Sequence, residues 1–233
     1  MAASNEGSRH EFLKLMGVEM SLGSFVRKMA GPLEPVLARA YRGFFFDIEN
    51  FAECIASLGD PRRVVEIGCG EGALISALAG RMPTATFLGL DVAPTVGRLF
   101  EGDSSRVSFV CADAEDVIET NGGSADMVLI CDVMHHVPEH QRDRVWAAAF
   151  ALVKTGGMIV FKEWIRSASP IYGLGYASDR YITGDRIQYQ SRDEWINAIR
   201  KVAPMWSICS EMSLSPWKSN HAFVLQNSQP EAT

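Results

Sequence analysis

Hydrophobic and polar positions along the chain change their spacing near residue 60. Before that point apolar residues recur every three or four positions, most clearly from 36 to 55, and this spacing predicts helices. Gly59-Asp60-Pro61 ends the helical stretch, because proline cannot continue a helix. We therefore expect residues 1–61 to form an N-terminal helical cover.

After residue 62, short apolar runs alternate with helical stretches. The runs predict strands at 63–68, 86–91, 107–113, 126–133 and 158–165, with helices over 71–81, 93–101 and 138–153 between them. Such alternation indicates βαβ units and a parallel sheet. A helix over 192–202 begins after Ser191, with Glu194 placed to complete a capping box, and runs at 205–214 and 221–226 predict two final strands. Residues 62–233 are thus expected to form an α/β core.

Composition limits the classes of partner. The chain has 233 residues, with 22 basic and 28 acidic side chains and a net charge of −6, so we expect no nucleic-acid partner. Its five cysteines are odd in number and lack a CxxC pair, which favours reduced thiols and a cytoplasmic location. No run approaches the ~18 apolar residues of a membrane span, so stable membrane insertion is not expected. Either a monomer or a homodimer fits this composition.

The segment Glu66-Ile67-Gly68-Cys69-Gly70-Glu71-Gly72, at the end of the first strand, carries the most information about function. Glycines there let the backbone turn sharply and approach a ligand closely. The spacing also fits the dinucleotide pattern, with Ala73 in the last place and Asp91 as the ribose-binding acid, which leaves a nicotinamide enzyme open. Glu66 argues against a dinucleotide, because an acid beside the turn repels a pyrophosphate. The same acid suits a positively charged ligand such as a sulfonium compound.

The Glu66-x-Gly68-x-Gly70-x-Gly72 pattern resembles motif I of the class I S-adenosylmethionine-dependent methyltransferases, as found in small bacterial methyltransferases. Further motifs follow at the expected strand ends, namely Asp91, Cys111-Ala112-Asp113-Ala114, Cys131–Pro138 and Leu152–Gly157, the last with Thr155 in place of the family's usual proline. The resemblance covers residues 62–165. It implies a Rossmann-like α/β fold, with a seven-stranded mostly parallel sheet and a C-terminal antiparallel hairpin.

The resemblance also implies an S-adenosylmethionine site at the strand ends. In the family, the acid matching Asp91 takes the ribose hydroxyls, the acid matching Asp113 lies beside the adenine, and Asp132 matches a position facing the transferred methyl. The cofactor-binding residues implied in this way are Glu66, Gly68, Cys69, Gly70, Gly72, Asp91, Val92, Asp113, Ala114, Cys131 and Asp132. The alternative for the three aspartates is that they only end strands and cap helices.

His135, His136 and Glu163 are the candidate catalytic residues. A histidine at a strand's carboxyl end can act as a general base, because its pKa lies near neutrality. The alternative is that both histidines are structural groups in the loop before the helix at 138–153. We expect no metal site, because the histidines are adjacent rather than four residues apart and no HExxH or paired-cysteine pattern accompanies them.

Residues 166–190 are expected to form a lid that recognises the substrate, since open α/β sheets bind ligands outside the carboxyl ends of their strands. The candidate substrate-binding residues are His136, Tyr172, Tyr176 and Tyr181, with Tyr41 and Arg42 from the N-terminal cover. The alternative is a surface loop whose tyrosines pack against the sheet.

These observations together predict a methyltransferase that moves a methyl group from S-adenosylmethionine to a small, partly apolar metabolite. Whether the acceptor atom is oxygen, nitrogen or carbon stays open. The alternative is a protein of the same fold that catalyses a non-methylating reaction or acts as a binding or regulatory module.

Overall fold

A computed structural model describes residues 43–178 and 187–227. The strands are β1 Arg63–Ile67, β2 Thr86–Asp91, β3 Val107–Cys111, β4 Ala125–Cys131, β5 Val153–Trp164, β6 Trp206–Ser213 and β7 Asn220–Asn227. The helices are α4 Ile48–Ala56, α5 Ala73–Arg81, α6 Ile118–Asn121, α7 Glu139–Leu152, α8 Pro170–Ser178 and α9 Arg192–Val202, with short 3₁₀ turns η2 Ser104–Arg106 and η3 Ala114–Val117.

The seven strands form one sheet in the order β3-β2-β1-β4-β5-β7-β6. Strands β1 to β5 are mutually parallel, while β7 runs antiparallel to both β5 and β6. The predicted Rossmann-like sheet with its C-terminal antiparallel hairpin is therefore confirmed. The strand order reverses at β1, between β2 and β4, and in open α/β sheets ligands bind in the crevice beyond the carboxyl ends of the strands at such a point.

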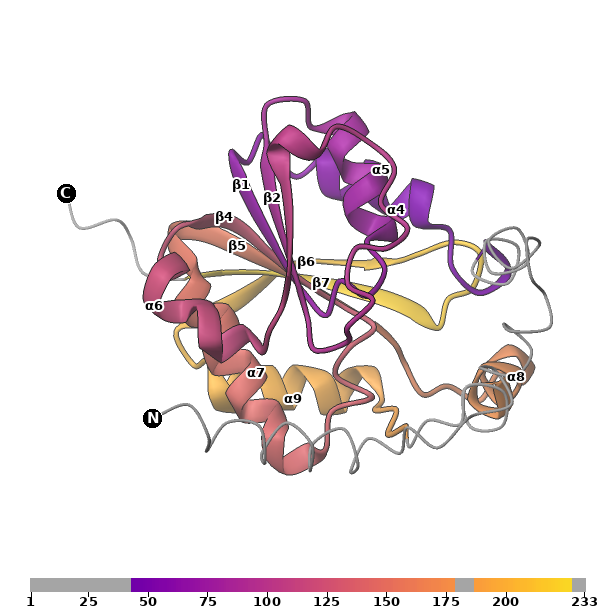
Figure 1. Ribbon diagram of the computed structural model, residues 1–233. Coiled ribbons are helices and arrows are strands. Elements are labelled where there is room, and N and C mark those ends of the chain that lie inside the picture. The colour runs from indigo at the N-terminus through magenta and orange to yellow at the C-terminus, as the bar shows by residue number, and fades with distance from the viewer. Residues whose placement is uncertain (1–42, 179–186, 228–233) are drawn as a thin grey trace.

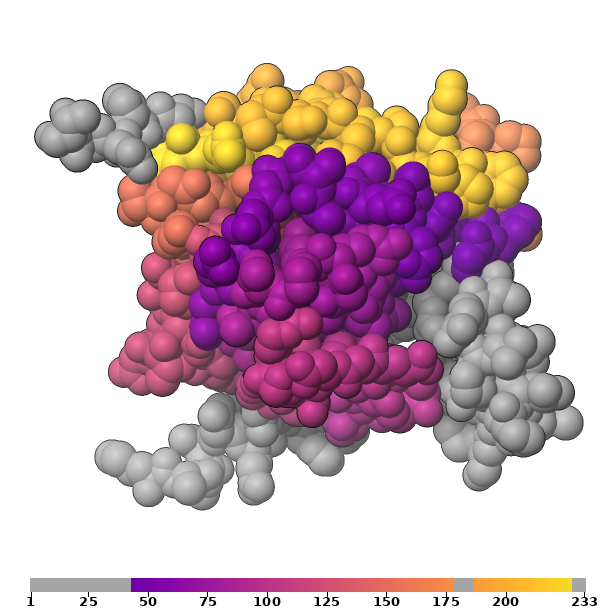
Figure 2. All heavy atoms as spheres, turned by 90° about the horizontal axis from the view of Figure 1, so that it is seen from above, coloured from indigo at the N-terminus to yellow at the C-terminus, as the bar shows by residue number. Residues whose placement is uncertain are grey.

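Helices cover both faces of this sheet (Figure 1). Helices α4 and α5 pack on one face, where Figure 2 shows them side by side with the C-terminal strands along one edge. Helices α7 and α9 cover the opposite face. Burial on both faces explains why residues 127–130 of β4 are all apolar and fully buried instead of alternating with polar residues.

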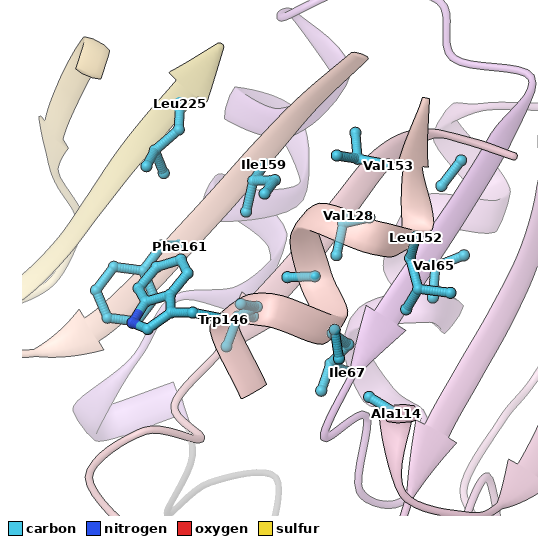
Figure 3. Close-up of a cluster of buried hydrophobic side chains, with 14 of the residues drawn as sticks. Val65, Ile67, Ala114, Val128, Trp146, Leu152, Val153, Ile159, Phe161 and Leu225 are labelled. Atoms are coloured by element: carbon cyan, nitrogen blue, oxygen red, sulfur yellow. The ribbon is translucent and has the colours of Figure 1, made fainter. Parts of the chain in front are cut away.

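Phe161 on β5 lies at the centre of the core on the α7 face. Its ring centroid is 4.9 Å from that of Trp146 on α7, 5.0 Å from that of Trp195 on α9 and 5.9 Å from that of Phe223 on β7. Figure 3 shows the Phe161 and Trp146 rings together, with Ile159 and Leu225 nearby. One aromatic side chain thus joins both helices of this face to the sheet.

The helix predicted over 93–101 is wrong, because the structure has turns there. The backbone N–H groups of Gly97 and Leu99 donate to the carbonyls of Gly70 and Glu71 in the loop after β1, at 3.0 and 2.9 Å. Gly97 also has a positive φ of 69°. The segment therefore makes its backbone hydrogen bonds with the glycine-rich loop instead of within a helix.

The described part of the predicted N-terminal cover is not separate from the core. Phe51 and Ile55 on α4 are fully buried in the same cluster as Leu78 of α5 and Leu129 of β4. The division into a cover at 1–61 and a core at 62–233 stays a prediction, since residues 1–42 lie outside the described residues. Among residues 43–178 and 187–227, no helix has the length and apolar character needed to cross a bilayer.

We expect Phe161→Ala to lower the free energy of unfolding by about 3–5 kcal/mol, because it leaves a cavity between two helices and the sheet. Urea unfolding of both proteins measures the change. Met205→Ala, at a side chain that is 49% exposed, is the control and should alter stability little. A loss below about 1 kcal/mol for Phe161→Ala would show that the core collapses around the deletion.

Candidate active site

The loop after β1 turns back at once and packs against the loop after β4. Gly68 has a φ of 72°, and a Cβ atom there would lie 2.2 Å from Cγ2 of Val133. Gly72, with a φ of 87°, is the N-cap of α5, where a Cβ would lie 2.8 Å from the Phe109 ring. Side chains are excluded at both positions, so these glycines keep backbone N–H groups and a helix N-terminus close to the crevice.

Glu66, the last residue but one of β1, is a buried carboxyl group at this turn. It is 3% exposed, and its Oε2 atom has no hydrogen-bond partner among the described residues. Burial, helped by the charge of Asp91, raises the pKa of Glu66 to about 8. Glu66 is therefore mostly protonated at neutral pH and ready to ionise when a cationic partner arrives.

Asp91, at the end of β2, fixes the glycine-rich loop. Its Oδ2 atom accepts a hydrogen bond from the backbone N–H of Gly70 and its Oδ1 atom one from Ala93, both at 2.8 Å. Val92 beside it is 36% exposed. The structure thus brings Glu66, the glycines and Asp91 together, as the sequence predicted.

Asp113 lies at the end of β3 and caps a short helical turn. Its Oδ1 atom accepts from the backbone N–H of Glu115 at 3.4 Å, at the start of η3, where Ala114 is buried. The capping alternative is realised here, and the adenine role stays a prediction. Burial raises the pKa of the Cys69 and Cys131 thiols, so both are neutral groups beside the crevice.

Asp132, immediately after β4, is held by Lys162 of β5. Its backbone has a positive φ of 55°, which is unusual for a residue other than glycine. The Lys162 Nζ atom lies 2.5 Å from Oδ2 of Asp132, and the backbone N–H of Asp132 donates to the Lys162 carbonyl at 2.9 Å. Lys162 is a site residue that the sequence pattern did not reveal, because it lies 30 positions from its partner.

Glu163 and His135 form a buried pair at the same edge of the sheet. Oε2 of Glu163 lies 2.6 Å from Nδ1 of His135, and Oε1 accepts from the backbone N–H of Met134 at 2.6 Å. In the tautomer with its proton on Nδ1, His135 donates to Glu163 and carries its lone pair on Nε2. Glu163 thus lies within β5, in the strand that the sequence predicted at 158–165.

The His136 ring lies against that of His135, with ring centroids 4.0 Å apart and the planes tilted by 42°. Burial and the neighbouring His135 hold the pKa of His136 well below its usual value, so it is neutral. Arg142 of α7 fixes this loop by donating from Nε to the carbonyls of Met134 and Val137, each at 3.0 Å. Sequence reasoning missed Arg142, whose position in an otherwise polar helical turn gave no sign of burial.

Asp132, His135 and Glu163 each bring one ligand atom within 4.8 Å of the others, which is the spacing a metal ion needs. The ammonium group of Lys162 already balances Asp132, and Glu163 is bonded to His135 and a backbone N–H. Groups of the protein itself thus pair with the carboxylates of this cluster. The absence of a metal stays a prediction.

An aromatic cluster lies beside the histidines, beyond the carboxyl end of β5. It comprises Trp164, Ile187 and Tyr189, which are buried, with Phe45, Ile171, Tyr172 and Trp217 packed against them. The Tyr189 ring lies 4.9 Å from that of His135 and 5.8 Å from that of Tyr172. Tyr176, on α8, is 41% exposed. Tyr41, Arg42 and Tyr181 lie outside the described residues.

The comparison with known families decides what kind of domain this is. A family model described as a methyltransferase domain matches residues 64–157, which hold the glycine-rich loop, Asp91, Asp113 and Asp132. This segment of the chain is similar to the class I S-adenosylmethionine-dependent methyltransferases. S-adenosylmethionine is the cofactor that this family implies.

The curated relatives match this chain over about half of its length. The ubiquinone biosynthesis O-methyltransferase of Thiobacillus denitrificans is 34% identical over 125 residues, which are 52% of each chain. The trans-aconitate 2-methyltransferase of Methylobacterium radiotolerans is 27% identical over 114 residues, 49% of this chain and 42% of the relative. This chain thus spans about half the length of the curated relatives that it matches.

Solved structures share the fold over a longer stretch. The S-adenosylmethionine-dependent methyltransferase SibL superimposes with a TM-score of 0.68 at 17% identity, covering 98% of this chain and 71% of SibL. The pyocyanin biosynthetic protein PhzM gives a TM-score of 0.66 at 19% identity, covering 87% of this chain and 61% of PhzM. At such identities the likeness shows the fold alone.

We expect the protein without cofactor to lose stability as the pH rises from about 5 to about 8, through the contribution of Glu66. Between the unfolded pKa of 4.5 and the folded value of about 8, the folded state keeps a proton that the unfolded state releases. The contribution to the free energy of unfolding falls by up to about 1.4 kcal/mol per pH unit. Glu66→Gln should remove this dependence.

Urea unfolding at pH 5.5 and pH 8.5 compares the two proteins. Glu53→Gln, on the exposed face of α4, is the matched control and should behave as the unmodified protein does. Identical pH dependences for the Glu66 variant and the unmodified protein would contradict the assignment of Glu66 as a buried neutral acid.

Proposed function

We propose that this protein transfers a methyl group from S-adenosylmethionine to an oxygen atom of a small, partly apolar metabolite. The observation that carries the proposal is the placement of the buried Glu163–His135 pair at the same sheet edge as Glu66 and the glycine-rich loop. Glu66 and the glycine-rich loop suit a cationic cofactor, and the Glu163–His135 pair suits removal of a proton from the acceptor. Names of relatives that include O-methyltransferases support oxygen as the acceptor atom.

The residues present fit the cofactor. S-adenosylmethionine, when bound, supplies a methyl group made electrophilic by a positively charged sulfur. The Oε2 atom of Glu66 is buried and has no partner among the described residues. It can therefore pair with the ammonium or sulfonium group of a cationic ligand. Gly68 and Gly72 keep side chains out of the turn, and Asp91 holds the loop in place through Gly70 while its oxygens can accept further hydrogen bonds.

His135 is the residue proposed to take the proton of the acceptor hydroxyl. Its Nε2 lone pair is fixed by the Nδ1 bond to Glu163, whose negative charge stabilises the imidazolium that forms. His136 is less suited to this step, because burial and its neighbour oppose protonation. His136 is instead proposed to contact the acceptor.

The aromatic cluster around Trp164 is proposed to bind the acceptor. The Tyr189 ring is tilted against that of His135, the Tyr172 ring packs edge-on against that of Tyr189, and α8 has no charged residue. Flat apolar surfaces of this kind hold a ring or chain while excluding water, which favours alignment of the methyl group with the acceptor oxygen. The lid at 166–190 is therefore retained as a proposal.

A cytoplasmic location, the lack of a nucleic-acid partner, and a monomeric or homodimeric state stay predictions. All five cysteines, at 54, 69, 111, 131 and 209, are free thiols, which agrees with a reducing compartment. The net charge of −6 agrees with a small-molecule substrate rather than a polyanion.

We expect the full-length protein to bind S-adenosylmethionine in isothermal titration calorimetry, and Gly72→Val to abolish binding, since its side chain would meet the Phe109 ring. Incubation with a panel of phenols and one aliphatic acid, followed by mass spectrometry, should show products that gain one methylene unit. Gly80→Val, on α5 where a Cβ meets nothing, is the control. Binding of NADH but not S-adenosylmethionine would overturn the proposal.

We expect His135→Gln and Glu163→Gln to lower kcat, the first by roughly 100-fold or more, while S-adenosylmethionine affinity stays within a few-fold. The loss follows from removing the base or the group that orients it. His140→Gln, at an exposed histidine of α7, should leave kcat unchanged. Full activity in both variants would show that the acceptor needs no base, as for an acceptor already ionised.

A further inference from the structure

The ammonium group of Lys162 is buried, and its burial needs compensation by neighbouring groups. Lys162 is 1% exposed, and its Nζ atom lies 2.5 Å from Oδ2 of Asp132 and 3.8 Å from the centroid of the Phe46 ring. Burying an ammonium group costs several kcal/mol unless a counter-charge offsets it. The Asp132 carboxylate and the Phe46 ring face supply that compensation.

The pair lies at the cofactor site. Val133, next to Asp132, makes the close contact with Gly68 that defines the turn after β1. The thiol of Cys131 is influenced by the charges of Glu66, Asp132 and Lys162 together, which places all three near one point. Three acids, Glu66 of β1, Asp132 after β4 and Glu163 of β5, therefore lie near this thiol, and the Lys162 ammonium group lies beside Asp132.

The arrangement matters because the charge on sulfur disappears during the reaction. Transfer of the methyl group to the acceptor oxygen breaks the carbon–sulfur bond, leaves its electron pair on sulfur, and sends the hydroxyl proton to the base. A free carboxylate near sulfur would stabilise the charged cofactor more than the transition state, in which that charge is already fading. Such a carboxylate would strengthen cofactor binding and slow the transfer.

We propose that Lys162 is a positioning residue that neutralises Asp132 and so sets how strongly the site prefers the sulfonium cofactor over its neutral product, S-adenosylhomocysteine. The inference rests on the proposed function, because it needs the cofactor at this edge. Lys162 acts through Asp132 and is not itself a catalytic residue. Its second effect is to help hold Asp132 in its left-handed backbone conformation, which is unusual for a residue other than glycine.

The test compares affinities for S-adenosylmethionine and S-adenosylhomocysteine by isothermal titration calorimetry at pH 7. Lys162→Met removes the charge with little loss of volume and should raise the preference for S-adenosylmethionine about fivefold or more, since Asp132 is then unbalanced. Asp132→Asn keeps a residue that tolerates a positive φ and should lower the preference, since Lys162 is then unbalanced. The double variant Lys162→Met with Asp132→Asn should return the preference close to its original value.

A matched control lies on the same two strands. Lys154 of β5 forms an ion pair with Asp126 of β4 at the opposite end of the sheet. Lys154→Met makes the same chemical change there and should leave the preference unaltered. Thermal unfolding of every variant shows whether it is folded, and Asp132→Asn carries the test if Lys162→Met does not fold.

A purely structural ion pair predicts a different outcome. Both single variants would then lower the affinities for S-adenosylmethionine and S-adenosylhomocysteine in equal proportion. The double variant would not restore the original ratio of the two affinities. That result, with both ligands still bound by the unmodified protein, would overturn the inference and leave the proposed function standing. Failure of the unmodified protein to bind either ligand would overturn both.

Discussion

The acidic groups that the parallel strands bring to one edge of the sheet have to be balanced there, and this balance determines the site. Asp91 is bonded to backbone N–H groups, Asp132 to Lys162, and Glu163 to a histidine. Glu66 is buried among them, and its Oε2 atom has no hydrogen-bond partner among the described residues. The edge therefore has room for one more positive charge, and the proposed cofactor brings it.

Much of the fold follows from local sequence. Strands β2 and β4 are buried on both faces, so most of their positions are apolar, and an aspartate stands at or directly after the end of each. Helix α9 was predicted with its bounds because Ser191 and Glu194 form the capping box that the sequence indicates. The helix predicted over 93–101 failed because its backbone donors bond to a loop more than twenty residues earlier, which periodicity does not reveal.

The sequence predicted part of the candidate site. The residues that it missed depend on tertiary contacts between different elements. Glu66 and Asp91 were found because each belongs to a motif at a strand end, and the carboxyl ends of parallel strands meet at the same edge of the sheet. Lys162 and Arg142 were not, because each gains its role from partners on other elements, and long cationic side chains are usually exposed. Helix α8, rich in glycine and tyrosine, has a composition that favours a loop.

The central claim is that Glu66 stays protonated until a cationic cofactor binds, and proton release on binding tests it most directly. Calorimetric titration with S-adenosylmethionine at pH 7, in two buffers of different ionisation enthalpy, counts the protons released. The account predicts release of most of one proton per cofactor bound, and none for Glu66→Gln. Equal binding enthalpies in both buffers for the unmodified protein, with undiminished affinity in the variant, would contradict it.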